Sequence, residues 1–205
     1  MDSILLATSN PHKLVEVTEI LSPLGVEVVG LADVGVDVPE PVEDASTFEG
    51  NARIKARYYA QHAQRPCLAD DSGLEVDGLG GAPGVHSARY SGVSGSREVR
   101  DLANNRKLIE ALQGVDPSGR TARFVCAMCL VAADGRILAE TRGTFEGVIV
   151  DEPRGENGFG YDPHLLVPEL DMTSAELDPS DKNARSHRGK ATSQIAALIS
   201  DLLGS

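Results

Sequence analysis

Two long, largely apolar runs in the second half of the chain limit the possible folds most strongly. They cover residues 122–133 and 136–150 and flank the dipeptide Asp134-Gly135. Asp-Gly is the dipeptide that suits a two-residue type I′ turn between antiparallel strands. The sequence therefore predicts a β-hairpin here, and the sheet of this protein is expected to contain an antiparallel pair.

The rest of the chain alternates strand and helix patterns, which are short apolar runs and apolar residues at helical spacing bounded by capping residues. Strands are expected at residues 3–7, 26–30, 66–70 and 164–167, and helices at residues 11–24, 46–64, 96–113 and 186–204. In the third helix, Val99, Leu102, Ile109 and Leu112 form the expected apolar face. Alternation followed by a hairpin predicts an α/β fold, a mixed twisted sheet with flanking helices.

Length and charge narrow the possible classes of protein. A chain of 205 residues fits a single domain, residues 1–205, in which we expect two lobes with an active-site cleft between them. The net charge of −12 argues against binding nucleic acid, which needs clustered Lys and Arg. No basic leader and no apolar run of about 20 residues is present, so no membrane partner is expected and the cytoplasm is the expected location.

The cysteines are Cys67, Cys126 and Cys129, an odd and sparse set that does not suggest a disulfide framework. Cys126 and Cys129 have the spacing of a redox or metal motif, but they lie in a β-like apolar run. Residues three apart in a strand point to opposite faces and cannot share a metal. We therefore expect two buried structural cysteines.

Adjacent carboxylates, Asp70 and Asp71, come where a strand is expected to end, which is where open α/β sheets place ligand-binding groups. Neighbouring carboxylates repel unless a cation joins them, so a divalent metal at Asp70 and Asp71 is one interpretation. The other is a solvated acidic turn in which Ser72 and Gly73 are turn residues.

Three further segments carry polar groups that suit a nucleotide. Residues 8–13 place hydroxyls, a lysine and the amides of a helix N-terminus where a phosphate could bind, although a simple capped helix fits as well. Lys55 and Arg57 add cations or form an exposed helix face. Phe159 lies between glycines on a loop and could stack on a base, and residues 186–190 either add polar contacts or simply begin a helix.

Taken together and in order, these segments resemble the inosine triphosphate pyrophosphatase family, whose members act on non-standard purine triphosphates. The resemblance spans nearly the whole chain. It rests on LATSNPHKLVEV, TFEGNARIKA, ADDSGLEVDGLGGAPGVHSARYSG, GFGYDP and SHRGKA. It implies hydrolysis of ITP, dITP, XTP and dXTP to a monophosphate and pyrophosphate, a Mg²⁺ cofactor and a homodimer.

The resemblance also implies roles for individual residues. Asp71 would be the general base and a metal ligand, Glu43 would help to hold the metal, and Ser72 would contact the substrate; Asp70 stays a candidate ligand because it is adjacent to Asp71. The triphosphate would be bound by Thr8, Ser9, Asn10, Pro11, His12 and Lys13, with Lys55 stabilising the departing pyrophosphate. The base and sugar would contact Phe159, Gly160, Tyr161, Asp162, Lys182, His187 and Arg188. One departure is that Gly50 stands before Asn51 where the family commonly has Glu, which puts a metal role for Glu49 in doubt.

Three alternatives are set against this function. Maf-like pyrophosphatases have a related architecture and prefer other nucleotides, but the GFGYD and SHRGKA segments count against them. A nucleotide-binding regulator without catalysis would bind a nucleotide but release no pyrophosphate, and the adjacent Asp70 and Asp71 count against that. A protein-interaction domain would leave the polar clusters unexplained.

Overall fold

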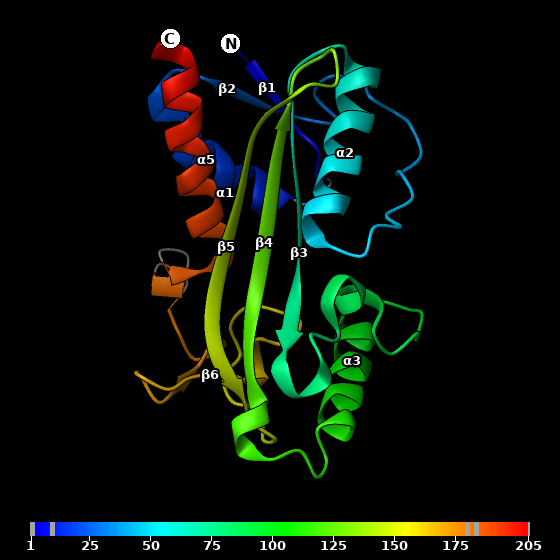
Figure 1. The fold of residues 1–205 in the computed structure, drawn as a ribbon, viewed down its shortest axis with the longest axis vertical. Coiled ribbons are helices and arrows are strands. Elements are labelled where there is room, and N and C mark those ends of the chain that lie inside the picture. The colour runs from blue at the N-terminus through cyan, green and yellow to red at the C-terminus, as the bar shows by residue number, and fades with distance from the viewer. Residues whose placement is uncertain (1–2, 9–10, 179–180, 183–184, 205) are drawn as a thin grey trace. The chain divides into compact units, whose positions relative to one another are not determined.

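The computed structural model describes residues 3–8, 11–178, 181–182 and 185–204 (Figure 1). The chain divides into two compact units. Unit 1 comprises Met1–Asp71, Cys126–Gly143 and Arg188–Ser205, and unit 2 comprises Ser72–Val125 and Thr144–His187. The expected cleft between two lobes stays a prediction, and so does the assignment of residues 1–205 to one domain.

The strands of the described part form one sheet of seven strands in the order β2-β1-β3-β4-β5-β6-β7. Their bounds are β1 Ser3–Leu6, β2 Glu27–Gly30, β3 Cys67–Val76, β4 Thr121–Val131, β5 Ile137–Ile149, β6 Leu165–Val167 and β7 Met172–Thr173. β1 pairs in parallel with β2 and β3, whereas β6 pairs antiparallel with β5 and β7. The predicted mixed α/β sheet is confirmed.

The helices that carry the site residues begin close to their predicted positions. Their bounds are α1 Pro11–Leu21, α2 Phe48–Ala63, α3 Arg97–Ala111 and α5 His187–Gly204. Thr47, rather than the predicted Ser46, caps α2, because the Thr47 hydroxyl accepts the Gly50 N–H at 3.1 Å. Ser96 caps α3 in the same way. No helix among the described residues is long and apolar enough to span a membrane.

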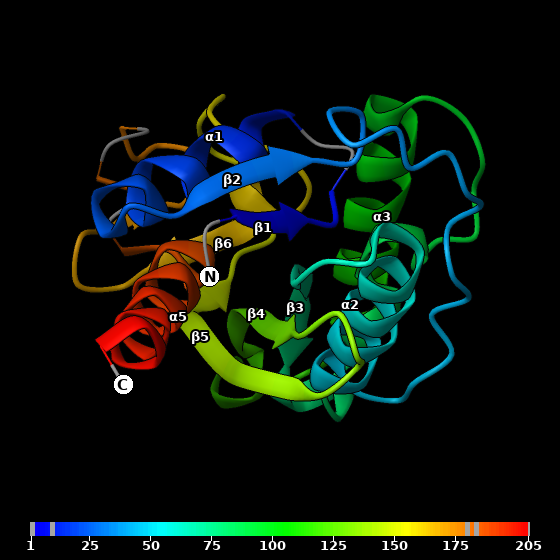
Figure 2. The ribbon, with the colours of Figure 1, turned by 90° about the horizontal axis from the view of Figure 1, so that it is seen from above.

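In unit 1 the sheet is covered on both faces. The first apolar cluster packs α1 and α5 on one face through Val17, Leu21, Ile195 and Ile199 (Figure 2). The second packs α2 on the other face through Ala52, Ala56, Tyr59 and Ala60. Cys126 belongs to the first cluster and Cys129 to the second. The prediction of buried cysteines on opposite faces is confirmed.

Unit 2 has an apolar cluster of its own, to which α3 contributes Leu108 and to which Leu112, the residue at its C-cap, also belongs. The predicted apolar face of α3 is wrong at its N-terminal half, since Val99 is 49% and Leu102 69% exposed. The residue buried there is Asn104, whose side chain accepts the Ser91 N–H and donates to the carbonyls of residues 87 and 88. A fully bonded amide thus replaces an apolar contact.

The predicted hairpin is confirmed as β4 and β5, which are adjacent in the sheet, but its type I′ turn is wrong. Such a turn needs positive φ at both Asp134 and Gly135. Gly135 has a φ of 87°, whereas Gln64 and Asp171 are the non-glycine residues with positive φ in the described ranges. The Asp134 carboxylate instead accepts the Arg136 N–H at 2.9 Å.

β3 runs further than predicted. A turn was expected at residues 71–73, but the strand continues through them to Val76. In the described part of the chain β3 pairs with β1 only at Cys67 and Leu68, but its other neighbour in the sheet is β4, and this strand pairing outweighs the turn preference of Asp, Ser and Gly. Asp70 and Asp71 therefore lie within a strand and not at its end.

Candidate active site

Asp70 and Asp71 point to opposite faces of the sheet, because successive side chains of a strand alternate. Leu68 belongs to the cluster under α1 and α5, so Asp70 shares that face, whereas Ala69 belongs to the cluster under α2, so Asp71 shares the other. Asp70 and Asp71 therefore have different hydrogen-bond donors, Lys13 and Asn51, while Lys55 acts to lower the pKa of both. The expectation that the two stand side by side at a strand end is corrected.

Asp70 is 5% exposed and pairs with Lys13, which extends from the first turn of α1 and is 22% exposed. The Lys13 Nζ lies 2.7 Å from the Asp70 Oδ2. Burial opposes ionisation, but Lys13, Arg188 and Lys55 together hold the pKa of Asp70 well below its usual range. Asp70 is therefore a carboxylate over the whole physiological pH range.

Asp71 has a different environment. The Asn51 Nδ2 of α2 donates to the Asp71 Oδ2 at 3.0 Å, and the Lys55 Nζ lies 3.6 Å from the Asp71 Oδ1. Burial raises the pKa of Asp71, helped by Glu43 and Asp70 and opposed by Lys55 and Asn51. A fixed carboxylate with a raised pKa is a stronger base than an ordinary aspartate.

Lys55 and Asn51 connect Asp71 to the acidic loop before α2. The Lys55 Nζ lies 3.0 Å from the Glu43 Oε2, and the Asn51 Oδ1 accepts the Ala45 N–H at 3.0 Å. Asn51 is not among the site residues predicted from the sequence, although its i, i+4 relation to Lys55 places both on one helix face. Glu49 is engaged elsewhere, with Arg142 at 2.8 Å.

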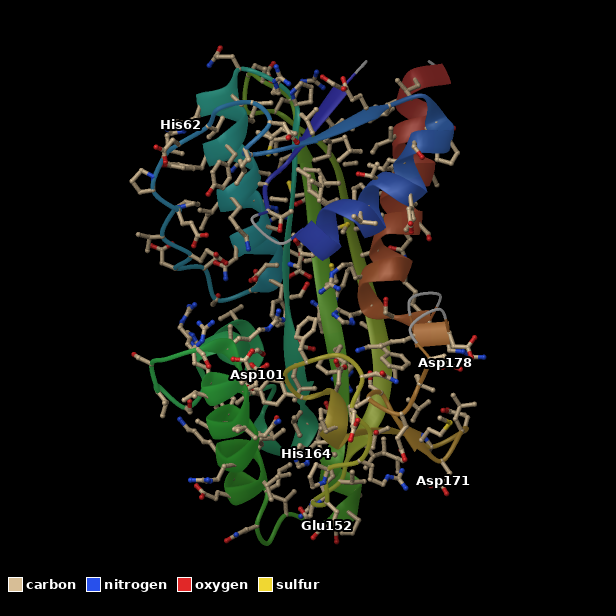
Figure 3. All side chains as sticks on the ribbon, turned by 180° about the vertical axis from the view of Figure 1, so that it is seen from behind. His62, Asp101, Glu152, His164, Asp171 and Asp178 are labelled. Atoms are coloured by element: carbon tan, nitrogen blue, oxygen red, sulfur yellow. The ribbon has the colours of Figure 1, made fainter. Side chains whose placement is uncertain are left out.

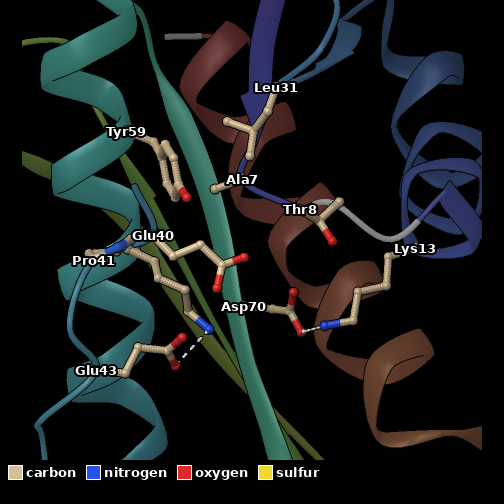
Figure 4. A pocket seen from close by; sticks show the side chains of 10 residues that line it. Ala7, Thr8, Lys13, Leu31, Glu40, Pro41, Glu43, Tyr59 and Asp70 are labelled. Atoms are coloured by element: carbon tan, nitrogen blue, oxygen red, sulfur yellow. Dashed lines mark hydrogen bonds and ion pairs between the residues drawn. The ribbon is translucent and has the colours of Figure 1, made fainter. Parts of the chain in front are cut away.

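A polar cavity of about 140 Å³ opens in unit 1 beside these groups. Its lining includes Ala7, Thr8, Lys13, Leu31, Glu40, Pro41, Glu43, Lys55, Tyr59 and Asp70 (Figure 4). Pockets that enclose a drug-sized ligand usually measure about 300–1,000 Å³. This cavity is therefore sized for phosphate groups rather than for a whole nucleotide.

The carboxylates in and beside the cavity could supply one or two ligands to Mg²⁺, but not a complete metal site. Within the described ranges, no group of three or more His, Cys, Asp or Glu side chains is gathered as a ready-made metal centre. Mg²⁺ usually takes one or two carboxylates and completes its shell with waters and substrate phosphates. Glu43, which lines the cavity, and Asp71, which is outside the lining but shares Lys55 with Glu43 as its cation, are carboxylates of that kind.

The predicted triphosphate segment is only partly described. Thr8 follows β1 and lines the cavity, and Lys13 reaches it from α1. Pro11 and His12 are the first residues of α1. Ser9 and Asn10 lie outside the described residues. Ser72 follows Asp71 within β3.

In unit 2, Asp162 organises the predicted base-binding loop from inside. It is buried, and its Oδ2 accepts the Phe159 N–H at 2.8 Å and the Lys182 ammonium at 2.6 Å. Its Oδ1 accepts the Ser174 hydroxyl at 2.8 Å. The carboxylate and the lysine that were predicted to contact the substrate thus hold the loop in shape.

The other predicted base contacts differ in accessibility. Phe159 is 47% exposed, whereas the Tyr161 side chain is buried and donates its hydroxyl to the Ser87 carbonyl at 2.8 Å. His187 stacks on Phe124 in unit 2, with ring centroids 5.2 Å apart, and Arg188 belongs to unit 1. Phe159 is therefore the aromatic ring of this loop that is available to a ligand.

The sequence model of the Ham1 family matches residues 4–198, which include all of these groups. The chain belongs to the Ham1 family. The family resemblance predicted from the sequence is thereby confirmed.

Ham1 relatives are similar over nearly their full length. A dITP/XTP pyrophosphatase of an Exiguobacterium species is 50% identical over 196 residues, which are 96% of this chain and 96% of that protein. The Bacillus subtilis dITP/XTP pyrophosphatase is 44% identical, with 97% of this chain and 98% of that protein covered. The structure of a HAM1 protein from Coxiella burnetii matches with a TM-score of 0.90 at 42% identity, covering 98% of this chain and 100% of that chain.

Proposed function

We propose that this protein hydrolyses non-standard purine nucleoside triphosphates, namely ITP, dITP, XTP and dXTP, to the monophosphate and pyrophosphate. This activity removes them from the nucleotide pool before they enter DNA or RNA. The observation that carries the proposal is Asp71, a carboxylate that is only 13% exposed, has a raised pKa and is fixed by Asn51 and Lys55. The names of the Ham1 relatives, dITP/XTP pyrophosphatases, support the substrate class.

The chemistry requires water to attack the α-phosphorus while pyrophosphate leaves. Asp71 orients that water and takes its proton, for which its raised pKa suits it. Lys13 and Lys55 stabilise the charge on the departing pyrophosphate. Because Lys13 is paired with Asp70, its ammonium must share its hydrogen bonds between Asp70 and a phosphate.

We propose Mg²⁺ as the cofactor, held by Glu43 and Asp71 with the substrate phosphates. Asp70 was also predicted as a ligand, but its pairing with Lys13 makes it the weaker candidate. A bound Mg²⁺ would neutralise part of the phosphate charge and act as a Lewis acid toward the phosphoryl oxygens.

Base selection follows from hydrogen-bond patterns. Hypoxanthine, xanthine and guanine present acceptors at O6 and N7, whereas adenine presents an N6 donor beside N7. The fork of Arg188 donates only, so it suits the first three bases and opposes adenine. We propose that Arg188 and His187 read this edge while the base stacks on Phe159.

The location and the assembly belong to the same proposal. We place the enzyme in the cytoplasm as a homodimer. The exposure of Val99 and Leu102 one turn apart on α3 supports a dimer, because a second copy would cover this apolar surface.

A panel of nucleoside triphosphates, assayed for pyrophosphate and monophosphate with and without Mg²⁺, tests the proposal. We expect ITP and XTP to be cleaved far faster than ATP or dUTP. GTP presents the same O6 and N7 acceptors, so its rejection requires an unpaired donor or a clash at the 2-amino group. A preference for dUTP would favour a Maf-like activity, and binding without pyrophosphate release would favour a non-catalytic regulator.

The role of Arg188 has its own test. Arg188→Ala should lower kcat/KM for ITP and XTP far more than for ATP, whereas Lys13→Ala should weaken all triphosphates comparably. An equal loss for every nucleotide in Arg188→Ala would make Arg188 a phosphate ligand.

A further inference from the structure

One stripe of α3 contacts the loop that carries Phe159. Arg97, Asp101 and Asn105 follow each other at intervals of four residues, so their side chains lie along one side of the helix. Each makes a contact with Phe159 or Gly160. Asp101 is labelled on this helix in Figure 3.

Two residues of the stripe fix the peptide groups on either side of the Gly160 Cα. The Gly160 N–H donates to the Asp101 Oδ2 at 2.9 Å, and the Asn105 Nδ2 donates to the Gly160 carbonyl at 3.0 Å. Gly160 has a φ of 62°, a conformation that glycine adopts without steric cost. The Phe159 N–H is bonded to Asp162, so the backbone of Phe159 is held on both sides.

The third residue of the stripe positions the ring itself. The Arg97 guanidinium carbon lies 3.8 Å from the centroid of the Phe159 ring, and the Arg97 Nε lies 3.9 Å from the Asp101 Oδ2. A guanidinium at this distance covers one face of the ring with a cation–π contact. Phe159 nevertheless keeps 47% of its surface exposed. The ring is therefore backed by Arg97, with the Lys182 Nζ at 5.9 Å from its centroid, and its exposed surface is available to a flat partner.

We infer that Arg97, Asp101 and Asn105 are positioning residues that hold the Phe159 ring ready to stack against a purine base. The inference rests on the proposed function, because that function supplies the purine. The three residues act through Phe159 and Gly160 and need no contact with the nucleotide. Their effect is on binding of the base, and it leaves the triphosphate end of the substrate untouched.

Because the three residues affect the base and not the triphosphate, their substitution should lower the affinity only for ligands that have a base. An exposed cation–π contact corresponds to a factor of about two to five in a dissociation constant, so Arg97→Ala should weaken inosine monophosphate by about that factor. Asp101→Ala leaves the Gly160 N–H without its acceptor and should weaken inosine monophosphate about tenfold. Pyrophosphate has no base, and its affinity should stay unchanged in both variants.

The experiment measures dissociation constants of inosine monophosphate and pyrophosphate by calorimetry for the wild-type chain and the variants. Arg106→Ala is the matched control, since it removes an exposed arginine of the same helix. Arg97→Lys keeps a cation and Asp101→Asn keeps an acceptor, so both should restore part of the lost affinity. Amide hydrogen exchange of Gly160, followed by NMR, should be slow in the wild type and fast in Asp101→Ala.

The outcomes separate the inference from the function on which it rests. The inference is supported if the variants lose affinity for inosine monophosphate alone and the Gly160 amide of the wild type is protected from exchange. Equal losses for both ligands, unchanged affinity for inosine monophosphate, or equally fast Gly160 exchange in wild type and Asp101→Ala overturns it. A wild-type chain that binds inosine monophosphate but releases no pyrophosphate from XTP overturns the proposed hydrolysis and leaves the positioning role standing.

Discussion

Replacing Asp70 by Asn tests whether this carboxylate serves mainly to hold Lys13. The substitution keeps the size of the side chain and an oxygen that accepts a hydrogen bond, but it removes the charge. Because Asp70 is 5% exposed and its pKa is held far below the usual range, the loss of charge is expected to cost stability. Metal is excluded from the measurement with a chelator, so that only the ion pair is tested.

The size of the effect follows from burial. Breaking a buried ion pair by removing one partner costs about 3–5 kcal/mol. Here the cost should be lower, because Lys13 is 22% exposed and retains both water and the amide oxygen as partners. We expect the free energy of unfolding to fall by about 2–3 kcal/mol, the scale of a hydrogen bond to a charged group.

The assay is urea denaturation at pH 7 and pH 3.5. Folding lowers the pKa of this carboxylate from its value of about 3.9 in the unfolded chain. The carboxylate therefore stabilises the folded state fully at pH values well above about 3.9, and this stabilisation decreases as the pH falls toward the pKa of the folded state. The difference between wild type and Asp70→Asn should therefore be constant from pH 8 to about pH 5 and smaller by roughly 0.7 kcal/mol at pH 3.5. Asp171→Asn is the matched control, since its side chain is 90% exposed and its loss should stay within about 0.5 kcal/mol.

Two results would refute this reasoning. One is an Asp70→Asn variant as stable as the wild type, which would show that the pair with Lys13 contributes nothing. The other is a stability difference that does not change between pH 7 and pH 3.5, which would assign the loss to packing and not to charge.

Three further predictions concern other parts of the chain. Asp71→Asn should fold normally by circular dichroism but lose at least about two to three decades of turnover, and near-normal turnover would move the base elsewhere. Cys126 and Cys129 should react only slowly with a thiol reagent in the native protein, because both are buried and burial raises the pKa of Cys129 to about 12. Rapid labelling would contradict their burial. Gly158→Ala should lower Tm more than Gly160→Ala. A Cβ at position 158 would overlap the Asp162 carboxylate and the Lys182 ammonium, whereas the space at position 160 is open. Equal decreases in Tm would leave backbone strain as the whole cause.

The sequence predicts the strand and helix pattern well where periodicity and capping agree, as in the hairpin and in α2. It fails at β3, because Asp, Ser and Gly at residues 71–73 have turn preferences that neighbouring strands override. That error matters for the site. A turn would place Asp70 and Asp71 together, whereas the strand directs them to different helices.

Buried amides are the other class of residue that the sequence does not reveal. Asn104 replaces an apolar residue in the face of α3, and Asn51 fixes both Asp71 and the acidic loop. Each is stable in its place because backbone or carboxylate partners from distant parts of the chain satisfy it. Hydrophobic periodicity carries no information about such partners, so only the folded structure shows them.

The division of the chain into units sets the order in which a ribosome can complete them. Every residue of unit 2 has been made once His187 is added, whereas unit 1 still lacks its last segment, Arg188–Ser205. That segment is almost entirely α5, which supplies Ala191, Ile195 and Ile199 to the core beneath β1. The core around β1 is thus incomplete until α5, which is synthesised much later, has been added. During translation the N-terminal strands must stay partly uncovered while the middle of the chain already has all of its partners, which reverses the usual N-terminal-first order of folding.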